Sequence, residues 1–474
     1  MKKYLSLAEV RADINAGNIT LPQLTQYYLD RIEEHKSLNA FIEVFAEEAK
    51  ARAIEVEQKM KAGNAGKLAG MVISIKDMIC YKNHKVSASS KILEGFESIY
   101  SSTVVERILA EDAIIIGRVN CDEFAMGASN ETSYYGNVHN FENEKLVPGG
   151  SSGGSAVSVQ ADLCLASLGT DTGGSVRQPA SFCGVVGLKP TYGRVSRWGI
   201  IAYASSFDQV GPITHSVQDA ALILEVIAGK DQYDSTASST AVEEYSKDLS
   251  LTNKPKIAYL SEAINSDGID PEVRQMMIEK IDSLRAQGFT VEEVEFPLLK
   301  YAVPTYYVLT TAEASSNLSR YDGVHFGYRS KNATDLESTY KLSRSEGFGE
   351  EVKRRIMLGT FVLSAGYYDA YYAKAQKVRR LIKEKSEEIL AKYDLMILPT
   401  APSTAFEMGA KTKDPVQMYL ADIFTVQASL AGLPAISIPG KTHSNQLSMG
   451  IQIIGKHFKE ADLLKFANFL EQKA

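Results

Sequence analysis

Residues 163–180 read LCLASLGTDTGGSVRQPA, and this stretch predicts a strand, a tight turn and a helix in quick succession. LCLASLGTD is an apolar run of strand length. Gly173 and Gly174 permit a sharp turn, and Ser175 then opens a short helical run. Such a turn places the Ser175 hydroxyl and nearby backbone N–H groups at the carboxyl end of a strand, where α/β proteins hold their sites.

The segments on both sides of this stretch predict an α/β fold. Short β-rich runs alternate with helical segments, which is typical of a sheet covered by helices. We expect a helical lead-in over residues 1–63, a core over 68–210 and a helical, tyrosine-rich insertion over 300–390. No repeat or low-complexity linker interrupts the chain, so we expect one domain over 1–474. Strands are predicted at residues 71–77, 113–120, 163–171, 254–261, 289–294, 394–400 and 435–440.

Composition excludes several classes of protein. The chain has 474 residues with 51 basic and 58 acidic side chains, and its net charge of −7 disfavours direct binding of nucleic acid. Its apolar runs stay below the ~18 residues of a membrane span, and the N-terminus does not read as a signal peptide. Four separated cysteines form no CxxC pair, which indicates a reduced, cytoplasmic protein without a disulfide framework or a cysteine zinc site.

A second glycine and serine patch, PGGSSGGSAVS, occupies residues 148–158. Neither patch fits GxxxxGK[ST], so a nucleotide-binding loop is not indicated. Gly149, Ser151 and Gly153 match the G-x-S-x-G elbow of α/β-hydrolases, but the preceding HNFENEKLVP is polar and does not form the strand that an elbow requires. We therefore do not predict an elbow at Ser151.

The turn at Ser175 suits a serine nucleophile with an oxyanion hole, although a helix N-cap explains the same residues equally well. Histidines after Ser151 lie in polar surroundings, which leaves lysine as the candidate base. Lys76 ends the apolar strand MVISI, where burial would lower its pKa from ~10.4. The alternative is a surface lysine whose stem lies along the sheet edge. Ser338 and Lys341 also form a Ser-x-x-Lys, but their segment is a polar helix face without a glycine turn.

Lys76 after a strand, the GGSSGGS run and DTGGSVRQPA together resemble the amidase signature family. The resemblance implies that family's fold, a large mixed sheet sandwiched between helices, with the helical insertion noted above. It also implies a Ser-cisSer-Lys triad with Ser175 as nucleophile, Ser151 as bridging serine after a cis peptide and Lys76 as base. The family's oxyanion hole and its supporting polar side chains correspond to the backbone N–H groups of Thr172, Gly173, Gly174 and Ser175, and to Ser152 and Asp171.

Longer stretches, including CDEFAMGASNETSYYGNV and MYLADIFTVQASLAGLPAIS, resemble the tRNA-dependent amidotransferase branch of that family. This resemblance implies that free glutamine is the substrate. Tyr306 and Arg355 would hold its α-carboxylate and Asp422 its α-ammonium. The residue types suit these roles, because an arginine fork matches a carboxylate and an aspartate complements an ammonium group.

The same resemblance implies partners. We expect a heterotrimer with two further subunits, B and C, in which ammonia from glutamine converts Glu-tRNA(Gln) or Asp-tRNA(Asn) to the amidated form. ATP, Mg²⁺ and tRNA would be bound by the B subunit, with no cofactor and no membrane contact expected for this chain. Two alternatives are a stand-alone amidase that hydrolyses small amides and a binding module without chemistry. Arg355 and Asp422 favour glutamine over simple amides, and the complete Lys76, Ser151 and Ser175 set argues against a binding module.

Overall fold

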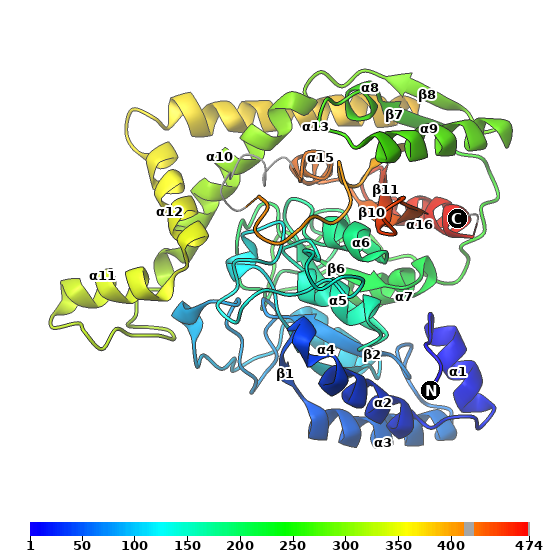
Figure 1. Cartoon of the computed structure of the whole chain (residues 1–474), viewed down its shortest axis with the longest axis horizontal. Helices are drawn as coiled ribbons and strands as arrows, with labels where there is room; N and C mark the ends of the chain where they lie inside the picture. Colours follow the sequence, from blue (N-terminus) through cyan, green and yellow to red (C-terminus); the bar gives the residue numbers. More distant parts are fainter. Residues whose placement is uncertain (412–420, 473–474) are drawn as a thin grey trace.

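The computed structural model describes residues 1–411 and 421–472, and in this part of the chain an eleven-stranded mixed sheet forms the centre (Figure 1). The strand order is β1-β3-β2-β4-β6-β5-β10-β11-β9-β7-β8. The strands are β1 (Phe41–Val44), β2 (Val72–Lys76), β3 (Ile114–Val119), β4 (Ala166–Asp171), β5 (Val186–Lys189), β6 (Gln209–Thr214), β7 (Ile257–Leu260), β8 (Val291–Val294), β9 (Leu395–Pro399), β10 (Ala435–Thr442) and β11 (Ser448–Gly455).

All seven predicted strands are present, and β1, β5, β6 and β11 were not predicted. Two of the missed strands, β1 and β5, have only four residues, and the other two contain glycine, as QVGPIT in β6 and SMGIQIIG in β11 show. Their pairing with neighbouring strands, rather than their own residue pattern, makes them strands. The mixed α/β sheet predicted from the sequence is confirmed.

The lead-in contains α1 (Leu7–Asn15), α2 (Leu21–Glu34) and α3 (Ala46–Ala62), as predicted, but it is not entirely helical. Residues 41–44 form β1, which pairs antiparallel with β3 at the edge of the sheet. The prediction of an all-helical lead-in is therefore wrong at this point. A four-residue run is too short for periodicity to distinguish a strand from a break between helices.

Helices cover both faces of the sheet. A Cβ at Gly450 would meet Ser181 of α6 (Arg177–Cys183), whereas a Cβ at Gly455 would meet Leu463 of α16 (Glu460–Glu471). The two glycines are five residues apart on β11, so they face opposite sides, because side chains alternate along a strand. α5 (Gly153–Gln160) packs beside α6, and α7 (Val217–Ile227) packs beside α16.

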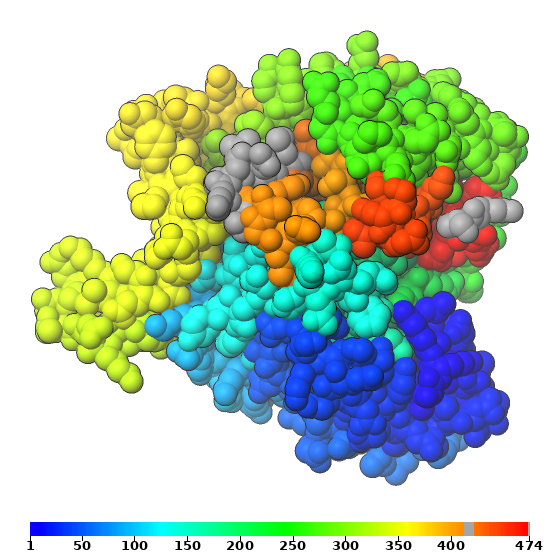
Figure 2. Space-filling model, in the orientation of Figure 1, coloured from blue at the N-terminus to red at the C-terminus, as the bar shows by residue number. Residues whose placement is uncertain are grey.

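The predicted helical insertion contains four α-helices. α10 (Leu299–Asn317) packs against α12 (Glu350–Leu363) and α13 (Lys374–Lys392), while the segment around α11 (Leu336–Gly347) projects from the body of the molecule (Figure 2). The other α-helices in the described part of the chain are α4 (Thr103–Ala110), α8 (Ser261–Ile264), α9 (Pro271–Ala286) and α15 (Val426–Ala431). Among the described residues, no helix is both long and apolar enough to cross a bilayer.

The strand order brings the two predicted chemical segments to one edge. β2 lies between β3 and β4 and is parallel to both. The carboxyl ends of β2 and β4 therefore meet at the same edge of the sheet, with Lys76 ending one strand and Asp171 ending the other. Because α5 begins directly after the GGSS run, its first turn lies beside these two strand ends.

At Gly154, α5 packs so closely against neighbouring backbone that a side chain has no room. A Cβ at this position would lie 2.3 Å from the carbonyl oxygen of Asn120 and 2.8 Å from that of Ala40. Gly154→Ala is expected to lower the free energy of unfolding by about 1–3 kcal/mol, because backbone atoms cannot move aside cheaply. Gly268→Ala is the matched control, since nothing lies within 4 Å of that Cβ. Urea denaturation of both variants measures the effect, and equal stabilities would contradict this packing.

Candidate active site

Lys76 is the last residue of β2 and is completely buried. Its Nζ lies 2.7 Å from Ser151 Oγ, 2.9 Å from Ser152 Oγ and 2.9 Å from Thr170 Oγ1. Burial disfavours the charged ammonium and lowers the pKa of Lys76 to about 8. The surface-lysine alternative is therefore wrong. The Lys76 amine lies among hydroxyl groups, and its pKa is close to neutral pH.

Ser151 follows a cis peptide bond, Gly150–Ser151, and is also fully buried. The Gly150 N–H donates to Gln178 Oε1 at 3.0 Å, and the Asp122 N–H donates to the Ser151 carbonyl at 3.1 Å. These contacts fix the chain on both sides of the cis bond. The Ser151 hydroxyl is consequently presented to Lys76.

Ser152 holds the lysine from a second side. Its hydroxyl donates to the Thr170 carbonyl at 3.1 Å and accepts from the Thr170 N–H at 3.3 Å and from Lys76 Nζ. This places Ser152 in contact with β4 as well as with the base. The supporting role predicted for Ser152 stays a prediction, but its contacts are those that such a role requires.

Ser175 lies in the turn between β4 and α6. Ser175 is 8% exposed, whereas the exposed fraction of Lys76 and of Ser151 is 0%. Ser175 is therefore the most solvent-accessible of the three. The Ser175 carbonyl accepts from the Ser152 N–H at 3.1 Å, which joins the two glycine and serine patches directly. Within the described residues Ser175 Oγ has no hydrogen-bond partner, so its relay to Ser151 remains a prediction.

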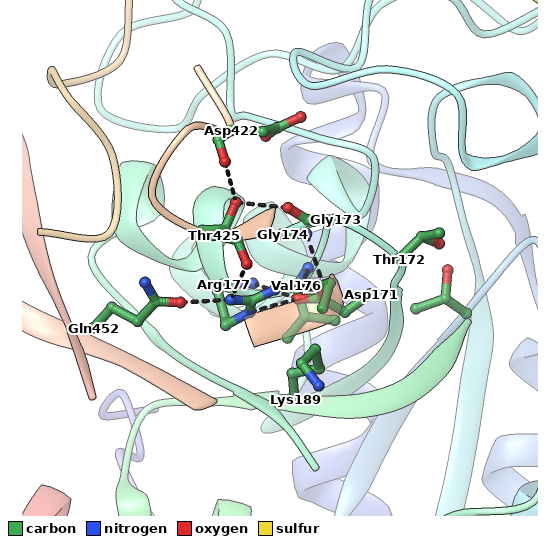
Figure 3. A network of polar contacts seen from close by, with 12 residues as sticks. Asp171, Thr172, Gly173, Gly174, Val176, Arg177, Lys189, Asp422, Thr425 and Gln452 are labelled. Atoms are coloured by element: carbon green, nitrogen blue, oxygen red, sulfur yellow. Dashed lines mark hydrogen bonds and ion pairs between the residues drawn. The ribbon is translucent and has the colours of Figure 1, made fainter. Parts of the chain in front are cut away.

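The turn itself is fixed by three neighbours (Figure 3). The Gly174 N–H donates to Asp171 Oδ1 at 2.9 Å, and Gly174 has a φ of 139°, which favours glycine. Thr425 Oγ1 donates to the Gly173 carbonyl at 2.6 Å, and Thr172 Oγ1 donates to Asp208 at 2.7 Å. The Gly174 N–H, predicted for the oxyanion hole, is thus engaged by Asp171. The N–H groups of Thr172, Gly173 and Ser175 make no hydrogen bond to a described residue.

Arg177 is the main structural residue that the sequence reasoning missed. Its Nε and Nη2 both lie 2.9 Å from the Asp171 carboxylate, and neither side chain is exposed. Burial alone would raise the pKa of Asp171, but the Arg177 guanidinium outweighs it and holds that pKa below its ordinary value. The signal was in the quoted motif, because an arginine six residues after the aspartate can fold back onto it across the turn.

Lys189 lies beside this ion pair at the end of β5 and is fully buried (Figure 3). Burial and the nearby Arg177 charge lower the pKa of Lys189 to about 7. Its Nζ donates to the Pro190 carbonyl at 3.0 Å. Near neutral pH this lysine therefore loses its proton readily. The charges of Asp171 and Arg177 then offset each other without a third charge beside them.

The three residues predicted to bind glutamine gather around the same turn. A Cβ on Gly173 would meet the Tyr306 ring at 2.4 Å, so Tyr306 lies directly on the turn. Arg355 Nη1 donates to the Tyr203 hydroxyl at 2.8 Å and Nε donates to Glu351 at 2.8 Å. Tyr203 was not predicted from the sequence.

Asp422 completes this group. Burial raises the pKa of Asp422 to about 8, although the Arg355 charge acts in the opposite direction. The charges of Asp422 and Arg355 also both act on the phenol of Tyr306, whose pKa burial raises well above its ordinary value. A bound ammonium group would lower the pKa of Asp422 and favour the carboxylate. Within residues 1–411 and 421–472, no cluster of three histidine, cysteine or acidic side chains could hold a metal ion.

Comparison with known proteins agrees with this site. Residues 23–464 match the family model described as amidase, so the chain belongs to the amidase family. The A subunit of glutamyl-tRNA(Gln) amidotransferase from Chlorobium phaeobacteroides is 48% identical over 99% of both chains. The crystal structure of the corresponding A subunit from Thermotoga maritima has a TM-score of 0.75 and 42% identity, covering 94% of this chain and 89% of that one. Peptide amidase from Stenotrophomonas maltophilia has a TM-score of 0.81 and 30% identity, covering 99% and 96%.

The pKa of Lys76 predicts the pH dependence of amide hydrolysis. Only the neutral amine can accept a proton, so kcat/KM for propionamide is expected to fall about tenfold per pH unit below a pKa of about 8. Propionamide carries no charge, which keeps titration of Asp422 from contributing through substrate binding. Lys76→Met keeps the length of the stem and is expected to abolish activity while far-UV circular dichroism stays unchanged. A flat profile between pH 6 and 9 would contradict this assignment of the base.

Proposed function

We propose that this chain is the glutaminase subunit of a tRNA-dependent amidotransferase. It hydrolyses glutamine and supplies ammonia for the ATP-dependent conversion of Glu-tRNA(Gln), Asp-tRNA(Asn) or both to the amidated aminoacyl-tRNA. The observation that carries this proposal is the full-length similarity to the A subunits of glutamyl-tRNA(Gln) amidotransferases. The buried pair of Arg355 and Asp422 beside the Ser175 turn supports it, because these charges complement the two charged groups of glutamine.

The reaction begins with transfer of a proton from Ser175 through Ser151 to neutral Lys76. Ser175 Oγ attacks the side-chain amide carbon, and the oxyanion that forms is stabilised by backbone N–H groups of the turn, of which those of Thr172, Gly173 and Ser175 are available. The proton returns through Ser151 to the leaving nitrogen, and ammonia departs. Water then hydrolyses the glutamyl ester on Ser175, which releases glutamate and restores the hydroxyl.

Lys76 suits this relay because its environment supplies hydroxyl groups rather than a carboxylate partner. Among the described contacts, its hydrogen bonds go to Ser151, Ser152 and Thr170. A direct carboxylate partner would favour the ammonium form and raise the pKa. The burial of Lys76 therefore sets its protonation, and Ser152 and Thr170 direct it toward Ser151.

Recognition of glutamine would use the three side chains around the turn. Arg355 binds the α-carboxylate with Tyr306 beside it, and Asp422 binds the α-ammonium. Tyr203 and Glu351 hold the Arg355 guanidinium in place from two sides. Both charged groups of the substrate are satisfied in this way, whereas a simple amide has no charged group with which to engage Arg355 or Asp422.

Partner subunits complete the proposed function. Subunits B and C would form a heterotrimer with this chain, and the B subunit would bind ATP, Mg²⁺ and the tRNA in the cytoplasm. The net charge of −7 supports this division, because a tRNA-binding surface normally needs excess positive charge. This chain would contact tRNA only through its partner and would hold no cofactor of its own.

Substitution of the nucleophile and of the carboxylate-binding arginine tests the glutaminase assignment. Ser175→Ala is expected to abolish glutamine hydrolysis. Arg355→Lys is expected to raise KM for glutamine on the order of 10- to 100-fold with little effect on propionamide, because lysine cannot form the bidentate contact. Arg380→Lys, an exposed arginine that pairs with Glu384, is the control. Wild-type turnover of propionamide equal to that of glutamine would favour a stand-alone amidase instead.

Gentle purification of the native protein tests the partner assignment. The chain is expected to elute from size-exclusion chromatography with two further polypeptides, to be identified by mass spectrometry. Recombinant addition of those polypeptides should then give ATP- and glutamine-dependent amidation of Glu-tRNA or Asp-tRNA. Recovery of the chain as an active, lone monomer without such partners would contradict the proposal.

A further inference from the structure

Thr425 lies between the segment that carries Asp422 and the turn that carries Ser175. Its hydroxyl is 2.6 Å from the Gly173 carbonyl and 3.0 Å from the Asp422 carbonyl, and the residue is completely buried. A hydroxyl has one hydrogen to donate, so these two carbonyls share it. Figure 3 shows Thr425 in this position, with the carbonyl of Asp422 on one side and the turn on the other.

The peptide unit between Gly173 and Gly174 is held at both of its polar ends. Thr425 binds its carbonyl, and Asp171 accepts its N–H at 2.9 Å. Because a peptide unit is planar, fixing both ends fixes its orientation. The N–H groups of Gly173 and Ser175 are available to an oxyanion and belong to the two adjoining peptide units, which share the Gly173 and Gly174 Cα atoms with this unit. A shift of the fixed unit therefore displaces these N–H groups.

Close packing leaves this peptide unit little room to rotate. A Cβ on Gly174 would lie 2.2 Å from Thr425 Oγ1, and a Cβ on Gly173 would lie 2.4 Å from the Tyr306 ring. Arg177 Nη1 also donates to the Thr425 carbonyl at 2.9 Å while the same guanidinium binds Asp171. The backbone and the side chain of Thr425 are therefore both tied to the turn.

We propose that Thr425 is a positioning residue that couples occupancy of Asp422 to the orientation of the Gly173–Gly174 peptide. This inference rests on the proposed glutaminase function, in which Asp422 binds the α-ammonium of glutamine. An ammonium group bound at Asp422 fixes the 422–425 segment, and the shared hydroxyl of Thr425 carries that constraint to the oxyanion turn. A simple amide leaves Asp422 unoccupied and gains nothing from the link, so the coupling adds to the selectivity for glutamine at the chemical step.

Three variants separate the hydroxyl from the shape of the side chain. Thr425→Val removes the hydroxyl and keeps the branched shape, whereas Thr425→Ser keeps the hydroxyl. Thr25→Val is the matched control, because Thr25 is an equally buried threonine whose hydroxyl donates to a backbone carbonyl at 3.0 Å in α2. Steady-state kcat and KM are measured for each variant with glutamine and with propionamide, and circular dichroism and urea denaturation report folding.

Thr425→Val is expected to lower kcat for glutamine on the order of 10- to 100-fold with KM changed less than about threefold, because glutamine bound at Asp422 no longer constrains the turn while the binding pocket itself is kept. Its kcat for propionamide should change less than about threefold, and Thr425→Ser should restore most of the glutamine rate. Thr25→Val should match the wild type with both substrates.

Two results would overturn the coupling while leaving the proposed function intact. One is an equal loss with both substrates in Thr425→Val, which would show that the hydroxyl only supports the turn. The other is a Thr425→Ser variant as slow as Thr425→Val, which would assign the effect to shape. A wild-type enzyme without preference for glutamine over propionamide would overturn both the proposed function and this inference, and it is distinguished from the first two results before any variant is measured.

Discussion

The ion pair between Asp171 and Arg177 is the interaction on which the site depends. Asp171 ends β4 and Arg177 begins α6, so their contact closes the turn that carries Ser175. Arg177 also donates to the carbonyl of Thr425 and to Gln452 of β11, which ties the turn to a distant part of the sheet. Loss of one partner of such a buried pair typically costs about 3–5 kcal/mol, because the remaining charge is left without compensation. The stability of the fold and the geometry of the Ser175 turn therefore both depend on this ion pair.

A second constraint is the neutral environment of Lys76. The amine is surrounded by hydroxyl groups of Ser151, Ser152 and Thr170, and burial sets its pKa to about 8. Acidic groups are present nearby but are bound elsewhere, Asp171 by Arg177 and Asp122 by the N–H of Asn130. The carboxylates thus fix the loops around the site and leave the lysine free to exchange a proton.

In the proposed substrate pocket, two buried side chains of opposite type, Arg355 and Asp422, are placed to bind the charged groups of glutamine. Arg355 is oriented by Tyr203 and Glu351, and Asp422 is buried with its pKa raised to about 8. An acid in this state binds a cation more strongly as it loses its proton, so ligand binding and ionisation are linked. Thr425 connects this acid to the oxyanion turn through backbone carbonyls. The proposed substrate-binding acid and the oxyanion turn are therefore neighbours, and they are linked by hydrogen bonds through Thr425.

The sequence by itself determined the α/β class and seven of the strands, because these depend on local periodicity. A strand end and a glycine turn pointed to Lys76 and Ser175, whereas Ser151 was assigned only through the resemblance to a known family. The sequence left Lys76 open between a buried base and a surface lysine, and the structure shows that the residue is buried. The tertiary structure alone decided the edge strand β1, the pairing of Arg177 with Asp171 and the contacts of Tyr203 and Thr425. These features join residues far apart in the chain or on either side of a turn, and only the folded packing sets which donor meets which acceptor.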